Sequence, residues 1–267
     1  MKNLCVLICI AVMLASCQWG VPKNKPDNTP FKDTLKYSYQ TIKQRAADCG
    51  TKPDSACTVV KIVYPLFDSA KTLNDTVTGK LTGMFAFEGK ADSSLQALTK
   101  NFLKSYTDFR KTDPRSVMFF TLDDSVRVLR QDSSLTTLQV KGYSYTGGAH
   151  GGSFTGFVNW DTKAGKNLRL DDIFAPGYQD KLKAVAERIF RKNEKLSDTA
   201  SLKDNYFFKD DKFALNNNFS VTPLGIKFLY NQYEIKPYAA GITELFIPYS
   251  QIKSLLQPNT VVSQYIK

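Results

Sequence analysis

The sequence contains a single histidine, His150, and only five cysteines among its 267 residues. Zinc sites are built from several histidine and cysteine ligands, which this chain cannot supply. The D-x-D-x-D spacing of a calcium-binding loop is absent as well, which leaves a calcium site built from other carboxylates as the alternative. We therefore predict no metal site and no bound cofactor. A serine hydrolase that depends on histidine would have to use His150 itself.

Long apolar runs are also scarce, and the one that stands out covers residues 4–14. Its length fits the core of a signal peptide and is too short for a mature membrane-spanning helix. Leu-Ala-Ser-Cys, at residues 14–17, resembles the bacterial lipobox, in which the cysteine is lipidated. We predict a lipoprotein signal peptide at residues 1–16 and lipidation of Cys17. An ordinary secretory signal followed by an incidental cysteine is the alternative.

The predicted lipid anchor determines the expected location. Two or more acyl chains hold a protein stably at a membrane, whereas a single chain does not. We expect a cell-envelope protein that is anchored to the membrane through Cys17 and faces the periplasm or the cell exterior. Residues 17–33 contain three prolines, Pro22, Pro26 and Pro30, and few apolar side chains, which predicts an extended tether.

The chain has no excess of acidic residues, and its formal net charge is +11. Basic and acidic residues are interspersed rather than gathered in long runs of one sign. A basic protein in the cell envelope is expected to meet anionic lipids or acidic glycans. Scattered lysines that only keep the protein soluble are the alternative. The predicted location excludes nucleic acid as a partner.

Two of the five cysteines lie in the predicted signal peptide. With Cys17 lipidated, Cys49 and Cys57 remain as a pair in an oxidising compartment. Glycine and proline between them indicate a turn that joins two strands, so we predict a Cys49–Cys57 disulfide. A reactive or metal-binding pair is the alternative, but the two cysteines lack CxxC spacing and a nearby histidine.

Hydrophobic periodicity predicts two long helices. Apolar side chains recur every three or four residues within residues 91–111, where Asp92 or Ser93 is the expected cap, and again within residues 177–193. A short helix is predicted to begin at Pro248.

Segments rich in β-branched and aromatic residues predict strands at residues 35–42, 57–67, 125–130, 136–146, 153–160, 225–231 and 243–249. Strands interspersed with helices in this order indicate an α+β fold. Because the pattern occurs twice, we predict two consecutive modules at residues 34–157 and 158–267. Each module is expected to be a mostly antiparallel sheet covered by a helix.

The only histidine lies in a turn between two predicted strands, among the glycines Gly147, Gly148, Gly151 and Gly152. A phosphate-binding loop needs a helix after its glycines, and here a strand follows. Ser153 does not fit the GxSxG pattern and also leads into a strand. We interpret His150 as a turn residue that makes a structural hydrogen bond. Contact with a partner and catalysis remain as alternatives.

Adjacent aspartates occur at Asp123–Asp124 and at Asp171–Asp172. Neighbouring side chains of a strand point to opposite faces, so the first pair is not expected to share a site. The second pair is interpreted as the cap of a turn. Glycoside hydrolases use two carboxylates that can be distant in the sequence, so this class remains open.

Three segments carry a resemblance to known proteins, namely YSYTGGAH at residues 143–150, residues 158–174 and residues 225–252. Together they resemble the extracellular region of RsiV-type anti-sigma factors and the non-catalytic N-terminal region of PdaC-type peptidoglycan deacetylases. The most specific block is YNQYEIKPYAAG, at residues 230–241.

The resemblance implies a PdaC-like module at residues 34–157 followed by an RsiV-like module at residues 158–267. In the anti-sigma factors this region is a lysozyme receptor, and in the deacetylases a separate zinc domain carries catalysis. The resemblance therefore implies a sensor or binding region and no enzymatic activity.

We predict a non-catalytic cell-envelope lipoprotein that binds a glycan or another envelope component. Aromatic faces stack on sugars and anchor protein interfaces, and several lie near predicted turns. The candidate ligand-binding residues are Tyr143, Tyr145, His150, Tyr233 and Tyr238. Trp160 and Tyr230 also lie near turns, although aromatic residues in strands commonly belong to the core.

Two other functions remain open. The first is lysozyme binding or inhibition, which we rank below a glycan. Common lysozymes are strongly basic, so a basic protein would lose electrostatic steering towards them. The second is an unrecognised envelope glycan hydrolase.

Overall fold

A computed structural model of the protein describes residues 34–86, 89–132 and 134–266. The predicted signal peptide, the Cys17 lipidation site and the tether at residues 17–33 lie outside these residues. Within the described ranges, no helix combines the length and the apolar composition that crossing a membrane requires.

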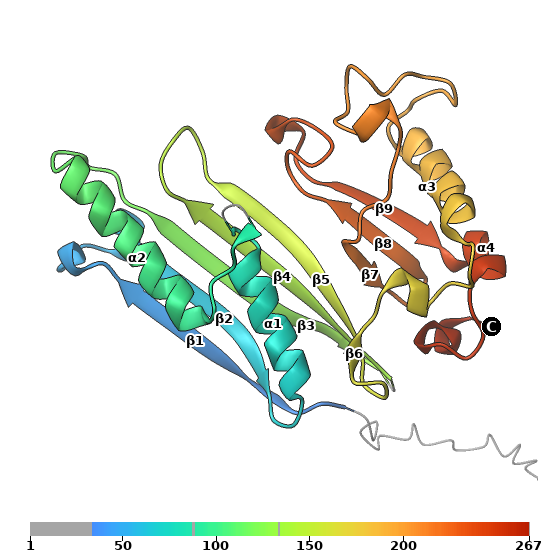
Figure 1. The fold of residues 1–267 in the computed structure, drawn as a ribbon, viewed down its shortest axis with the longest axis horizontal. Helices are drawn as coiled ribbons and strands as arrows, with labels where there is room; N and C mark the ends of the chain where they lie inside the picture. Colours follow the sequence, from blue (N-terminus) through green and yellow to red (C-terminus); the bar gives the residue numbers. More distant parts are fainter. Residues whose placement is uncertain (1–33, 87–88, 133, 267) are drawn as a thin grey trace, which may run out of the picture. The chain divides into compact units, whose positions relative to one another are not determined.

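The first sheet has six strands, in the order β1-β2-β3-β4-β5-β6 (Figure 1). Their bounds are Tyr37–Arg45 (β1), Val59–Phe67 (β2), Thr121–Gln131 (β3), Leu135–Tyr145 (β4), Gly152–Asp161 (β5) and Lys166–Asn167 (β6). All neighbours are antiparallel except β2 and β3, which are parallel. Parallel neighbours need a long crossover connection, and here that connection contains two helices.

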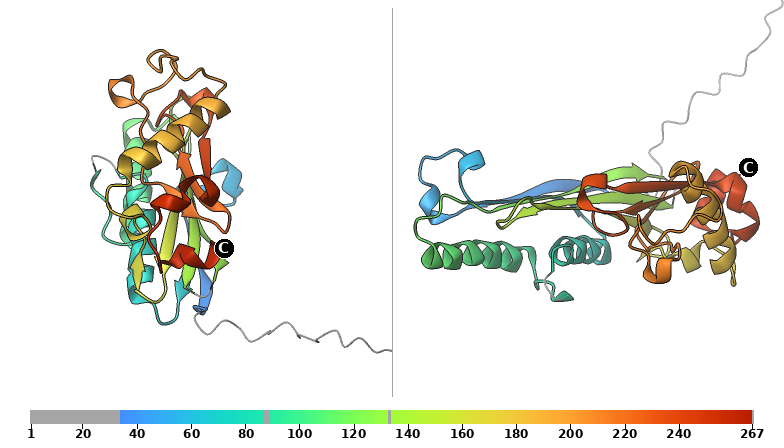
Figure 2. Two further views of the ribbon diagram at one scale, coloured as in Figure 1. Left: turned by 90° about the vertical axis from the view of Figure 1, so that its right-hand side faces the viewer. Right: turned by 90° about the horizontal axis from the view of Figure 1, so that it is seen from above.

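Helices α1 (Lys71–Gly83) and α2 (Leu95–Thr112) cover one face of the first sheet (Figure 2). Helix α2 was expected, but its cap is Ser94, whose hydroxyl accepts a hydrogen bond from the Ala97 N–H. Helix α1 was not expected. Its buried side chains recur every four residues, but threonine and glycine lie between them and lower its helix propensity.

The second sheet has three antiparallel strands, β7 (Phe219–Val221), β8 (Gly225–Tyr230) and β9 (Thr243–Pro248). Helix α3 (Gln179–Asn193) packs against β9, and the short helix α4 (Tyr249–Ile252) follows β9 directly (Figure 1). Aromatic side chains fill this second core, including Phe174, Phe190, Phe213, Phe219 and Phe228. The predicted α+β fold with two modules is confirmed.

The change from the first sheet to the second comes later in the chain than the expected boundary between residues 157 and 158. That boundary falls inside β5, which continues to Asp161 and pairs with β4 along its length. Strand β6 then pairs with the end of β5. The alternation of apolar residues identifies a strand but does not indicate which sheet it joins.

The predicted disulfide between Cys49 and Cys57 is confirmed. Both cysteines are buried, and they lie in the connection that joins β1 to β2. The Cα atoms are 5.3 Å apart, a distance typical of disulfides.

Candidate functional site

His150 contacts two tyrosines from the segment that connects two strands of the other sheet. His150 belongs to the turn between β4 and β5, whereas Tyr233 and Tyr238 belong to the segment between β8 and β9. The His150 and Tyr238 rings stack with their centroids 3.7 Å apart and their planes at 14°. The Tyr233 centroid lies 6.1 Å from that of His150 and 5.6 Å from that of Tyr238. We call His150, Tyr233 and Tyr238 the aromatic cluster.

Both ring nitrogens of His150 have partners within the protein. Nδ1 lies 3.0 Å from the Gly151 carbonyl oxygen, and Nε2 lies 3.2 Å from the Tyr233 hydroxyl. A carbonyl oxygen can only accept, so Nδ1 carries the hydrogen of the first bond. In a neutral imidazole, Nε2 then accepts from the Tyr233 hydroxyl. The predicted structural hydrogen bond of His150 is therefore present, together with a second bond that links the turn to Tyr233.

The backbone of the turn uses two of its four glycines in the left-handed region. Gly147 has a φ of 111° and Gly148 a φ of 89°. Gly151 is needed for a different reason, because a Cβ atom there would lie 2.5 Å from Cζ of Tyr143. The Tyr143 ring thus lies against the Gly151 backbone.

Tyr233 also has a positive φ, of 65°, and its side chain is 58% exposed. A bulky residue rarely adopts this conformation, and such backbone outliers concentrate at functional sites. The Glu234 carboxylate holds the segment in place. It accepts hydrogen bonds from the Asn231 N–H at 2.8 Å and from Nδ2 of Asn216 at 2.6 Å. Surrounding structure therefore fixes Tyr233 in a strained conformation with its ring towards solvent.

Asparagine side chains connect the first sheet to the second near the aromatic cluster. Asn231 accepts from the Thr155 N–H at 2.7 Å and donates to the Thr155 carbonyl oxygen at 3.1 Å. Nδ2 of Asn218 donates to the same oxygen at 2.8 Å. Further along β5, the buried Asn159 donates to the Phe219 carbonyl oxygen and accepts from the Val221 N–H, both at 2.8 Å.

Sequence reasoning did not identify Asn159, Asn218, Asn231 or Glu234. The signal in the sequence was a polar residue inside an apolar run that predicts a strand, as at Asn159. Which backbone group such a side chain reaches depends on tertiary structure and could not be read from the pattern.

The remaining candidate tyrosines lie beside the turn and outside the aromatic cluster. The Tyr145 hydroxyl donates to the Gly148 carbonyl oxygen at 3.2 Å. In the described part of the chain, neither Tyr143 nor Tyr145 has a ring contact with the aromatic cluster. Trp160 and Tyr230 are buried and belong to the two cores, as expected for aromatic residues of strands.

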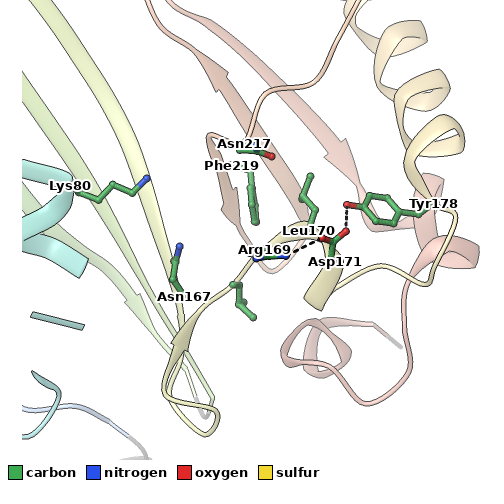
Figure 3. Close-up of a pocket in the computed structure, with 9 residues that line it drawn as sticks. Lys80, Asn167, Arg169, Leu170, Asp171, Tyr178, Asn217 and Phe219 are labelled. Carbon is green, nitrogen blue, oxygen red and sulfur yellow. Dashed lines mark hydrogen bonds and ion pairs between the residues drawn. The ribbon is translucent and has the colours of Figure 1, made fainter. Parts of the chain in front are cut away.

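A separate cavity of about 470 Å³ is lined by Lys80, Asn167, Leu168, Arg169, Leu170, Asp171, Tyr178, Asn217 and Phe219 (Figure 3). Asp171 connects two of its polar residues. It forms an ion pair with Arg169 at 3.5 Å and accepts a hydrogen bond from the Tyr178 hydroxyl at 3.0 Å (Figure 3). Burial, followed by the hydrogen bond to Asp171, raises the pKa of Tyr178 to about 12. Tyr178 therefore stays a hydrogen-bond donor at neutral pH.

The adjacent aspartates behave as the sequence indicated. Asp123 is exposed, whereas Asp124 is completely buried on the side of the helices. Asp172 accepts a hydrogen bond from the Arg169 N–H at 2.8 Å and caps the turn at Leu170–Asp172. Among the described residues, no group of three or more His, Cys, Asp or Glu is placed to share a metal ion.

Comparison with known proteins identifies two family regions. The family model described as "Deacetylase PdaC" matches residues 51–153, and the model described as "Protein of unknown function (DUF3298)" matches residues 171–250. None of the curated proteins matches the chain.

Two similar solved structures share the fold. A DUF3298 family protein from Pseudomonas aeruginosa PAO1 has a TM-score of 0.69 and 24% identity, and the match covers 86% of this chain and 98% of that one. A member of the same family from Bacteroides fragilis NCTC 9343 has a TM-score of 0.65 and 23% identity, with 87% and 98% covered. The match to the PdaC model ends at residue 153, just after the turn that carries His150, and the match to the DUF3298 model contains Tyr233 and Tyr238.

Proposed function

We propose that the protein is a non-catalytic lipoprotein of the cell envelope that binds a glycan or another envelope component through the aromatic cluster. One observation carries the proposal. Tyr233 is held in a strained backbone conformation with its ring exposed, beside a stacked His150–Tyr238 pair that joins the PdaC region to the DUF3298 region.

The chemistry of the aromatic cluster suits a sugar ligand. The apolar face of a pyranose ring stacks on an aromatic ring, and tyrosine hydroxyls add hydrogen bonds at the edge. A ring that is already fixed loses little side-chain freedom when a ligand binds. The network at Glu234 and Asn231 supplies that fixation for the segment of Tyr233.

A basic residue near the turn favours an anionic glycan. Lys141 is exposed and lies two residues before Tyr143 on the same face of β4. Across the described ranges, Lys141 forms no ion pair. Together with the net charge of +11, this lysine also weighs against a strongly basic lysozyme as the partner.

A hydrolase would need two carboxyl groups in one cleft, about 5–10 Å apart. Asp92 and Asp124 both line a cavity beneath α1 and α2. Asp124 is 0% exposed, however, so its carboxyl group is closed to a bulky polymeric glycan chain. Binding therefore remains the preferred function.

The test is co-sedimentation of the full chain, in detergent, with purified insoluble peptidoglycan. The variant of choice is Tyr233→Asn, because asparagine tolerates a positive φ and should keep the local backbone intact. We expect the bound fraction to fall at least about tenfold, the scale of losing one stacking contact and one hydrogen bond. Tyr39→Asn is the matched control, since Tyr39 is 49% exposed and lies on β1, the outer strand of the first sheet on the side away from β5.

Three results would count against the proposal. Equal binding by the Tyr233 variant and the wild type would remove the aromatic cluster as the contact. Retention of lysozyme, with no binding to peptidoglycan, would favour the receptor alternative. Release of soluble sugar from peptidoglycan by the wild type would favour the hydrolase.

A further inference from the structure

Asp124 is a buried carboxyl group without a partner. It lies on β3 opposite Gly142 of β4, in a cavity lining shared with residues of α1 and α2, and it is 0% exposed. Neither of its carboxyl oxygens has a hydrogen-bond partner in the described structure. Buried polar groups are nearly always hydrogen-bonded, and each exception calls for an explanation.

The residue opposite Asp124 leaves room for its carboxyl group. A Cβ atom on Gly142 would lie 2.7 Å from Oδ1 of Asp124 and 2.8 Å from Cε2 of Phe85. It would also overlap Sδ of Met84, so Met84 and Phe85 pack into this space as well. Any side chain at position 142 would thus occupy the space beside the carboxyl group.

Asp124 also belongs to the lining of a cavity of about 380 Å³. The residues that line the cavity range from buried ones at its inner end to exposed ones at its outer end. Its buried residues are Leu81, Thr82, Leu122 and Asp124, its half-buried residues include Phe85, Leu98 and Phe102, and its exposed residues are Lys90, Asn101, Ser105 and Thr146. A ligand in this cavity would have a polar end near solvent, an apolar middle and a polar group at Asp124.

Burial, followed by the charge of Asp123, raises the pKa of Asp124 to about 8. At neutral pH without a ligand, Asp124 is therefore mostly a protonated acid. Among the residues that the structure describes, the other charged ones that line the cavity are Lys90 and Asp92. Of these, Asp92 accepts a hydrogen bond from Nδ2 of Asn101 at 2.5 Å.

We propose that this cavity binds the ammonium group of a lysine-like side chain or a small alkylamine, with Asp124 as its counter-ion. The alkyl stem packs against Phe85, Leu98 and Phe102, and the ammonium group donates hydrogen bonds to the two carboxyl oxygens. On binding, Asp124 releases its proton to solvent. The site is independent of the aromatic cluster.

The chemistry of the cavity favours an ammonium group over other ligands. An ammonium carries three donors and a positive charge, so it satisfies both acceptors and compensates the buried charge. The faces of Phe85 and Phe102 are compatible with a cation. A divalent metal would need several oxygen ligands, whereas Asp124 is the only buried carboxyl group in the cavity lining that the structure describes.

Titration calorimetry of the full chain in detergent tests the proposal with a matched pair of probes. Nα-acetyl-lysine methylamide carries the ammonium group, and Nα-acetyl-norleucine methylamide has the same stem without it. We expect the lysine probe to bind roughly tenfold or more tightly than the norleucine probe, as for one charge-assisted hydrogen bond. Titrations in two buffers of different ionisation enthalpy should also reveal the released proton.

Three variants separate this site from other causes. Asp124→Asn keeps the size of the side chain and removes its charge, so it should fold and lose the preference for the lysine probe. Lys90→Met removes the cation of the rim and should bind the lysine probe at least as tightly as the wild type. Tyr233→Asn should bind it unchanged, which distinguishes failure here from failure of the proposed glycan contact.

The proposal is overturned if the lysine probe does not bind, or if both probes bind equally. It is also overturned if the Asp124 variant, shown to be folded by circular dichroism, retains the preference for lysine.

Discussion

The imidazole ring of His150 lies flat against the phenol ring of Tyr238, with the two centroids 3.7 Å apart. The two residues are 88 positions apart in the sequence and come from different family regions. Their contact therefore depends on the correct placement of both sheets. A measurement that is sensitive to the turn of His150 is also sensitive to how the two regions fit together.

Gly147→Ala should destabilise the protein more than Gly148→Ala. Both positions have a positive φ, so alanine is strained at either by about 1 kcal/mol or more. Only at Gly147 does the added Cβ also meet a side chain, with Sδ of Met118 at 3.0 Å. The midpoint of thermal unfolding gives the order. Gly152→Ala is the control, because Gly152 lacks a positive φ and its nearest atom lies 3.9 Å away. Equal losses at all three positions would contradict this prediction.

The stability of the protein should depend on pH through Asp124. Its pKa is about 8 in the folded protein against an ordinary value of 3.8, so between these pH values the native state binds more protons than the unfolded state. The stabilisation that the native state gains from holding this proton is fully present below about pH 4. The free energy of unfolding then falls as the pH rises, by up to about 1.4 kcal/mol per pH unit, until about pH 8.

Asp124→Asn removes this titration. The free energy of unfolding of the variant should therefore rise relative to that of the wild type between about pH 5 and about pH 8. Urea unfolding at both pH values measures the difference. A constant difference between the Asp124 variant and the wild type would show that the carboxyl group is ionised throughout this range.

Asn159→Ala should lower the free energy of unfolding by about 2–3 kcal/mol. The buried amide bonds the Phe219 carbonyl oxygen and the Val221 N–H, and its removal leaves two buried backbone groups without these bonds. Urea unfolding again provides the measurement. Asn217 is an exposed asparagine two residues before Phe219, and Asn217→Ala should change the free energy of unfolding by less than about 0.5 kcal/mol. A loss of similar size at both positions would argue against a specific role for Asn159.

Cys17→Ala should move the protein from the membrane fraction to the soluble fraction of cells that express it. The reason is the expected attachment of acyl chains at Cys17, without which no stable anchor remains. Immunoblots of the separated fractions provide the measurement, and Cys49→Ala controls for the loss of any cysteine. If the protein stayed in the membrane fraction, the predicted anchor would be excluded.

The periodicity of apolar residues and the positions of turn residues were sufficient to predict much of the fold. The alternating apolar residues of β4 and the repeating ones of α2 predicted these elements, and turn residues between Cys49 and Cys57 predicted the disulfide. Helix α1 was not predicted, because threonine and glycine weaken its helical pattern of apolar residues. The order of the sheet, with parallel β2 and β3 on either side of two helices, is a long-range property that periodicity does not encode.

The candidate site was predictable in its residue types and much less in its geometry. An aromatic block and a glycine turn with one histidine pointed to Tyr233, Tyr238 and His150. Their mutual contact, and the strained φ of Tyr233, arise only when two segments about 80 residues apart meet. Asp124 shows the limit from the other side. The alternation of side chains along β3 places Asp124 on the other face of the sheet from Asp123. Nothing in the pattern, however, reveals a buried acid without a partner.

The asparagine contacts at Thr155 have a consequence for solubility. An outer strand whose N–H and C=O groups point to solvent is a template on which another molecule can add a strand, and this is a common start of aggregation. Beyond the two residues of β6, β5 is the outer strand of its sheet. Asn231 and Asn218 occupy both backbone groups of Thr155, so side-chain amides take the place of a neighbouring strand at this position. The junction of the two regions thereby also protects the protein against self-association at this position.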